Sequence, residues 1–182
     1  MKYTLRRKFF VLLGKEFSIT SEDGSLVGYA KQKAFKLREE LTIFVDQAMT
    51  KPLVSIKARN IIDFNAIYDV VDAESGQNLG AIRRMGFRSM LRDEWHIYSP
   101  GDNELAIVQE ESGALALVRR LLTNLVPQRF DMRVGTQDAG GFQQQFNPFR
   151  YVMDIEVNEA LIDKRVAFAC AVLLAAVEGR QE

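Results

Sequence analysis

The sequence has very few of the residues from which catalytic and metal sites are usually built. It contains one cysteine, Cys170, and one histidine, His96, among 182 residues. A single cysteine forms no internal disulfide, which favours a reducing compartment. A single histidine leaves little material for a metal site or a catalytic triad. We therefore expect no enzyme, no cofactor and no metal, and we expect a cytoplasmic protein that is at most peripheral to a membrane.

The sequence also has no excess of charge of either sign. Lysine and arginine number 24, as do aspartate and glutamate. Nucleic-acid-binding domains normally have a basic footprint, so we expect no nucleic-acid partner. The hydrophobic fraction of 47% is that of a folded globule rather than a disordered chain.

No apolar run is long enough to cross a membrane. The longest, from Val166 to Val177, is flanked by charged residues on both sides. As a helix it would rise about 18 Å, whereas the hydrocarbon core is about 30 Å thick. Its faces are all apolar, which indicates a buried helix, with a membrane anchor as the alternative. We predict a central helix over about 163–178, with Asp163 as N-cap and Gly179 after its end.

The rest of the chain reads as short strands separated by turns. Alternating β-branched and aromatic residues recur, turn signals come every 8–12 residues or so, and the four prolines fall between or at the start of the runs. Residues 112–127 are the exception, because their leucines and valine repeat at helical spacing and predict a connecting helix at about 114–123. The predicted strands are 3–12, 16–20, 26–33, 41–46, 53–58, 66–72, 78–85, 93–98, 104–110, 129–134, 141–147 and 150–157.

An internal repeat is the most specific feature of the sequence. "EDGSLVGYAKQK" (22–33) corresponds to "ESGQNLGAIRRM" (74–85), so that Gly24 and Gly28 correspond to Gly76 and Gly80. In each pair the first glycine fits a hairpin turn, and the second lies inside the next strand. A fainter third unit begins at residues 129–134, with a turn expected at Gly140 and Gly141.

Three units of about four strands give a long antiparallel meander, whose edges are hidden only if it closes into a barrel. Twelve strands enclose more space than their side chains fill, so the apolar helix is the natural occupant of the bore. We predict one mainly β domain over residues 1–182, a twelve-stranded closed antiparallel barrel around a central hydrophobic C-terminal helix.

Several of these stretches together resemble the LURP-one-related proteins, relatives of the phospholipid scramblases and of the tubby C-terminal domain. They include "MKYTLRRKFF", "REELTIF" (38–44), "ESGQNLG" and the apolar helix after Asp163. The resemblance implies a tubby-like barrel around a central C-terminal helix. Tubby domains bind phosphoinositides, and scramblase relatives are linked to calcium-dependent lipid movement. The latter have an upstream proline-rich region and a cysteine cluster, both of which this chain lacks.

Pairs of basic residues two or four positions apart predict cations on one face of four strands. Most such pairs simply lie on a solvated outer face. If several of these strands align, their cations would form a site for anionic lipid headgroups. We expect a non-catalytic binding or scaffold module that contacts anionic phospholipid, phosphoinositide or a protein partner. The alternatives are an acyl-chain or small-ligand carrier and a scramblase-like membrane-associated protein. The headgroup candidates are Arg6, Lys8, Lys31, Lys33, Lys57, Arg59, Arg129 and Arg133.

Overall fold

The computed structural model describes residues 1–10, 14–32, 40–59, 66–85, 93–111, 127–147 and 150–178. The predicted connecting helix, Lys33 and Gly179 lie outside these residues. The described strands are β1 (Lys2–Phe10), β2 (Gly14–Ser21), β3 (Leu26–Gln32), β4 (Glu40–Phe44), β5 (Pro52–Ala58), β6 (Ile67–Asp72), β7 (Asn78–Arg84), β8 (Glu94–Tyr98), β9 (Glu104–Glu110), β10 (Arg129–Val134), β11 (Gln137–Gln144) and β12 (Tyr151–Val157), and the described helix is α2 (Lys164–Glu178).

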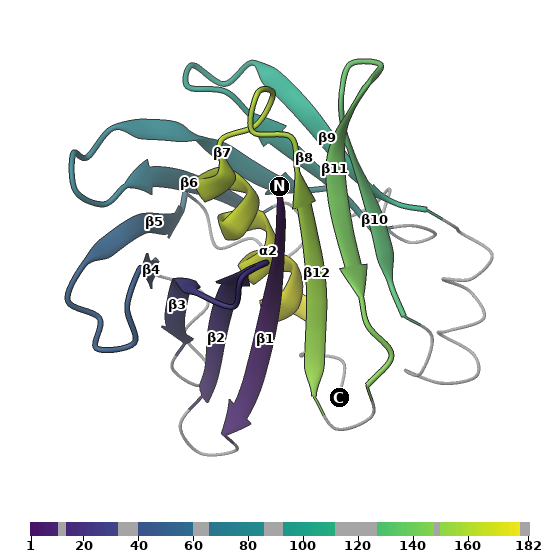
Figure 1. Cartoon of the computed structure of the whole chain (residues 1–182). Helices are drawn as coiled ribbons and strands as arrows, with labels where there is room; N and C mark the ends of the chain where they lie inside the picture. The colour runs from purple at the N-terminus through teal and green to yellow at the C-terminus, as the bar shows by residue number, and fades with distance from the viewer. Residues whose placement is uncertain are drawn as a thin grey trace.

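The strands form one closed antiparallel barrel in which each strand pairs with its sequence neighbours (Figure 1). The ladder between β1 and β12, from Lys2↔Glu156 to Arg7↔Tyr151, closes the ring and leaves no free edge. The predicted twelve-stranded barrel with a central C-terminal helix is therefore confirmed. We call the end at which α2 begins the upper end, and the end at which α2 ends the lower end (Figure 1).

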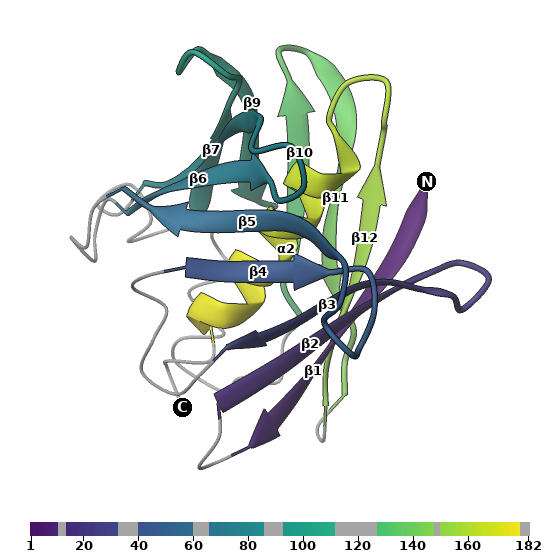
Figure 2. The ribbon, with the colours of Figure 1, turned by 90° about the vertical axis from the view of Figure 1, so that its left-hand side faces the viewer.

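Helix α2 lies inside the ring of strands, as the second view makes plain (Figure 2). Every residue from Val166 to Ala176 is at most 3% exposed, so all faces of the helix pack against the barrel wall. Phe168 meets the ring of Tyr3 edge to face, with centroids 4.8 Å apart. Among the described residues, no helix has the length and apolar content needed to cross a membrane.

The repeat appears in the structure as three units of four strands. Gly28 and Gly80 both occupy the third position of their strands, β3 and β7, and both follow a register shift in the ladder to the preceding strand. In the third unit the turn lies at Gly135 and Thr136, not at the predicted Gly140 and Gly141. Gly140 lies inside β11 and is the counterpart of Gly80.

Close approach of the neighbouring strand explains why positions 80 and 140 are glycine. Gly80 and Gly140 have φ of +135° and +108°, and a Cβ at either would lie 2.2 Å or less from a carbonyl oxygen of the next strand. Only glycine fits such a position. The prediction of a turn was wrong because a glycine pair signals a turn and a close strand crossing equally well.

Candidate functional site: a basic face at the lower end of the barrel

The headgroup candidates that are described all have exposed side chains on the outside of the barrel. The structure divides them into three groups according to strand. Arg6 and Lys8 (β1) and Lys31 (β3) lie near one another, Lys57 and Arg59 belong to β5 and the residue after it, and Arg129 and Arg133 belong to β10. The groups differ in how far neighbouring carboxylates neutralise them.

The β5 group is balanced by acids. Lys57 Nζ lies 3.5 Å from Glu40 on the neighbouring strand β4. Arg59 donates from Nε to Asp69 at 2.7 Å and from Nη2 to Asp102 at 2.8 Å. The Arg59 hydrogen bonds hold the pKa of Asp102 below its ordinary value. Three carboxylates therefore face two cations, so this group has no net positive charge to offer an external anion.

The β10 group lies in acidic surroundings. Arg129 Nε is 3.2 Å from Glu111 and 3.7 Å from Asp131. Arg133 lines a surface hollow of about 500 Å³ together with four carboxylates from β9, β10 and the residue after β9, namely Glu104, Glu110, Glu111 and Asp131. An anion near this strand would be repelled by more charges than would attract it.

The third group has a local excess of positive charge. The ladders place Lys8 opposite Glu16 on β2, and Glu16 opposite Lys31 on β3. On the other side, the β1–β12 ladder ends at Arg7↔Tyr151, and the exposed Arg150 directly precedes Tyr151, one residue beyond that last pair. Arg6 lies one row above. We call Arg6, Lys8, Lys31 and Arg150 the lower basic face; Glu16 is the acid among them.

Two side chains of this face are held in place by their neighbours. Arg6 Nη1 donates to Thr20 Oγ1 at 3.2 Å. Lys31 Nζ is 3.3 Å from Glu16 and lies over the buried ring of Tyr29, 5.7 Å from its centroid. The hydrogen bond with Glu16 raises the pKa of Lys31, which keeps it charged. The face can therefore present fixed cations to a phosphate group.

The strands of the basic face also supply cations to the bore. Arg7 Nη1 donates to the carbonyl of Ala175 at 2.5 Å, and Lys15 Nζ donates to the carbonyl of Ala176 at 3.0 Å. The Arg7 guanidinium also lies over the Tyr151 ring, 4.4 Å from its centroid. These carbonyls belong to the last turn of α2, where the helix dipole favours positive charge. Arg7 and Lys15 thus cap the helix from inside.

The upper part of the same outer surface has the opposite charge. A groove of about 860 Å³ extends over β12, β1 and β2 and reaches β10 and β11. Its cations are the N-terminal ammonium, Lys2, Arg129 and Arg6, which also belongs to the lower basic face. Since its carboxylates outnumber them, the groove is net acidic and disfavours an anionic ligand. Its carboxylates are Glu22, Asp131, Asp138, Asp154, Glu156 and Glu159.

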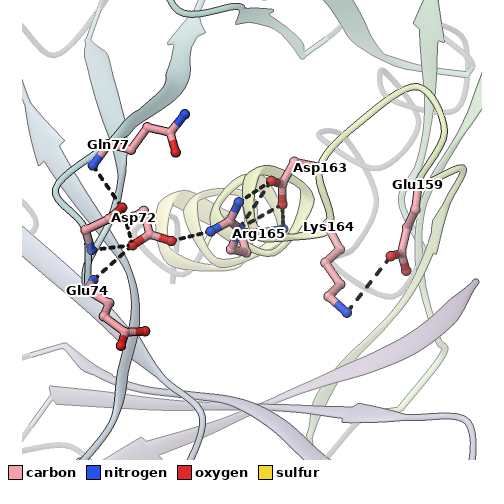
Figure 3. Close-up of polar contacts among 8 residues, drawn as sticks. Asp72, Glu74, Gln77, Glu159, Asp163, Lys164 and Arg165 are labelled. Atoms are coloured by element: carbon pink, nitrogen blue, oxygen red, sulfur yellow. Dashed lines mark hydrogen bonds and ion pairs between the residues drawn. The ribbon is translucent and has the colours of Figure 1, made fainter.

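Carboxylates also surround the beginning of α2 (Figure 3). Asp163 is the N-cap as predicted, since its Oδ1 accepts from the Arg165 backbone N–H at 2.8 Å. The Arg165 guanidinium bridges Asp163 and Asp72, the last residue of β6. Hydrogen bonds from Arg165 lower the pKa of Asp163, and backbone and hydroxyl donors of Ser75 lower that of Asp72. The start of the helix is therefore tied to the barrel rim.

The histidine and the cysteine both serve packing. His96 is 7% exposed, and its Nδ1 and Nε2 each lie 2.7 Å from a carboxylate oxygen, of Glu104 and of Glu94. Cys170 is fully buried in α2, and that burial raises the pKa of its thiol to about 12. It therefore stays protonated at neutral pH and is a poor nucleophile. No group of residues suited to a metal ion occurs in the part of the chain that the structure describes.

The comparisons with known proteins agree with this architecture. The family model for LURP-one-related proteins matches residues 26–175, which is most of the chain. This chain belongs to the LURP-one-related family. It is also similar to the X-ray structure of an Arabidopsis thaliana protein, with a TM-score of 0.55 at 14% identity over 97% of this chain and 91% of the other. That likeness concerns the fold. No curated protein matches.

The sequence located part of this site and missed the rest. Pairs on single strands identified Arg6, Lys8 and Lys31, but not which pairs would be neutralised. Arg150 was missed because it precedes its strand, and only the β1–β12 ladder, which ends at Arg7↔Tyr151, shows that it lies near the end of β1. Arg7 and Lys15 were missed because the sequence analysis did not apply strand alternation to them. Alternation directs them toward the bore, whereas Arg6 and Lys8 point outward.

Proposed function

We propose that this chain is a non-catalytic binding module that docks on anionic phospholipid surfaces through its lower basic face. The observation that carries the proposal is the local charge balance in the ladder. Glu16 lies between Lys8 and Lys31 in the ladders, and Arg6 and Arg150 add two further cations nearby, in a chain whose overall formal charge is zero. Each cation close to an anionic membrane contributes about 1 kcal/mol of attraction.

Two other features support a surface interaction rather than an internal ligand. The bore is occupied by α2, whose residues 166–176 are each at most 3% exposed. An acyl chain held between helix and wall would have to displace this packing, which makes the carrier alternative less favourable. The other headgroup candidates that the structure describes lie among more carboxylates than cations, so the lower basic face is the better candidate for anion binding.

The test is cosedimentation with vesicles of two compositions over a series of salt concentrations. We expect binding to vesicles that contain phosphatidylserine, little binding to pure phosphatidylcholine, and a steep loss of affinity as salt rises. The reason is screening, since the Debye length is about 8 Å in physiological buffer. Equal binding to both compositions, or binding insensitive to salt, would refute the proposal. Failure to bind either would favour a protein partner instead.

A further inference from the structure

Phe146 is a large apolar side chain exposed at the lower end of the barrel. Its exposed fraction is 64%, whereas the aromatic residues of the core are 9% exposed or less. It lies in the hairpin between β11 and β12, directly after Gln145, whose N–H donates to Val152 at 2.8 Å. An aromatic ring left in water at a hairpin tip has no role in the packing of the barrel.

Phe146 lies close to the lower basic face. Val152, the partner of Gln145, is paired with Arg6 in the β1–β12 ladder. Two strand spacings therefore separate the Phe146 hairpin from β1, or about 10 Å. Arg150, itself part of the face, belongs to the same hairpin and donates its N–H to Asn147 Oδ1 at 3.0 Å. The exposed ring and the cations thus occupy one end of the molecule.

Among the described residues, the other strongly exposed apolar side chains lie apart from these cations. Met49, 39% exposed, is in the turn between β4 and β5 at the upper end, and Leu26, 36% exposed, begins β3 there. Met1, 72% exposed, borders the acidic groove. Ile107, 36% exposed, lines the acidic hollow on β9. Positive charge and an exposed apolar ring coincide at Phe146, which is the combination that interfacial membrane anchors use.

We propose that Phe146 inserts into the interfacial region of an anionic bilayer when the lower basic face meets the headgroups, so that the lower end of the barrel faces the membrane. The inference rests on the proposed function and adds an apolar anchor and an orientation. Lipid headgroups match the cations, and the acyl boundary matches the ring. A soluble phosphate compound would satisfy only the cations, so it would leave Phe146 in water.

The experiment places an environment-sensitive dye at position 146. Cys170 is the chain's single cysteine and is fully buried, so Phe146→Cys directs the dye to one site. Unmutated protein, which should take no dye, checks this. We expect a blue shift and a rise in emission when vesicles with phosphatidylserine are added, and neither with inorganic phosphate. The matched control, Met49→Cys at the opposite end, should show no change.

A second variant measures the contribution to affinity. Phe146→Ser should weaken vesicle binding about 10-fold or more, whereas Met49→Ser should leave it unchanged. Vesicle binding without a dye response at 146 overturns the insertion and leaves the proposed function standing. A response at 49 instead overturns both, since it would place the upper end of the barrel against the membrane. Absence of vesicle binding by the unmutated protein overturns both.

Discussion

The two ends of the barrel face opposite ends of the α2 dipole, and each provides side chains of the opposite charge. At the upper end, Asp163 accepts the free N–H of Arg165 in the first turn of α2, and acids predominate in the adjoining groove. At the lower end, Arg7 and Lys15 donate to the last carbonyls of the same helix, and cations outnumber acids in the lower basic face. Both arrangements agree with the helix dipole, positive at its start and negative at its end.

The comparison shows why neighbouring residues of one short stretch have different roles. In "LRRKFF", strand alternation sends Arg7 inward to the helix and Arg6 and Lys8 outward to solvent. The inner cation has a fixed partner and contributes to stability. The outer cations face solvent, where the proposed anion binding would take place. A variant of either kind should therefore affect one property and spare the other.

The largest expected effect comes from the middle of α2, on which both ends depend. Leu173 is 1% exposed. Leu173→Asp would bury an unpaired carboxylate, which costs several kcal/mol of a total stability of about 5–15 kcal/mol. We expect no cooperative thermal transition by circular dichroism. Leu173→Met, similar in volume, should melt within a few degrees of the unmutated protein. A cooperative transition near the original temperature for Leu173→Asp would show that the helix is not the core.

The next effect distinguishes the two arginines of the lower end. Arg7→Leu removes the donor to the Ala175 carbonyl and should lower the free energy of unfolding by about 1.5–3 kcal/mol. Arg6→Gln should change it by less than about 0.5 kcal/mol, because Arg6 is exposed. Urea titrations measure both values. Similar stability losses in the two variants would mean that inner and outer cations do not have separate roles.

The upper end should be sensitive to acid. The pKa values of Asp163 and Asp72 lie below their ordinary value in the folded state. Their contribution to stability is therefore complete above about pH 4 and is lost as the pH falls through the lower, folded-state values. Melting temperatures between pH 7 and pH 2 should decline mainly below about pH 4. Asp163→Asn should make that decline shallower and should cost at most about 1 kcal/mol at pH 7, because asparagine keeps the cap and loses only the charge near Arg165 and the helix N-terminus. If the melting temperature of Asp163→Asn fell as steeply with pH as that of the unmutated protein, Asp163 would not be a source of the acid sensitivity.

Much of the fold could be predicted from the sequence, because its signals depend on residues that are close together in the chain. Strand alternation, turn glycines and a wholly apolar segment each report on their own neighbourhood, and barrel closure follows from hiding strand edges. The candidate site depends on which strands are adjacent and in which register. Glu16 compensates Lys31, Asp69 and Asp102 neutralise Arg59, and Arg150 comes near the end of β1 only through the ladders. No spacing within one strand contains that information.

The smallest effects concern single acids on the shared outer surface. Glu16 lies inside the lower basic face, so Glu16→Gln should raise the affinity for anionic vesicles by about fivefold. Glu156 is on the upper part of β12, roughly 20 Å from Lys8 along the strands, which exceeds the Debye length at physiological salt. Glu156→Gln should therefore change the affinity by less than about twofold. The reverse order would place the binding surface at the upper end.

The most direct test of the account is the affinity of two triple variants for vesicles containing phosphatidylserine, measured side by side. One variant changes Arg6, Lys8 and Lys31 to glutamine, and the other changes Lys57, Arg129 and Arg133. Both lose the same positive charge from the candidate cations of the sequence, but only the first loses it from the lower basic face. At about 1 kcal/mol for each cation, the first should bind about 100-fold more weakly, and the second less than about threefold more weakly. Equal losses, or a larger loss in the second variant, would contradict the assignment of binding to the lower basic face.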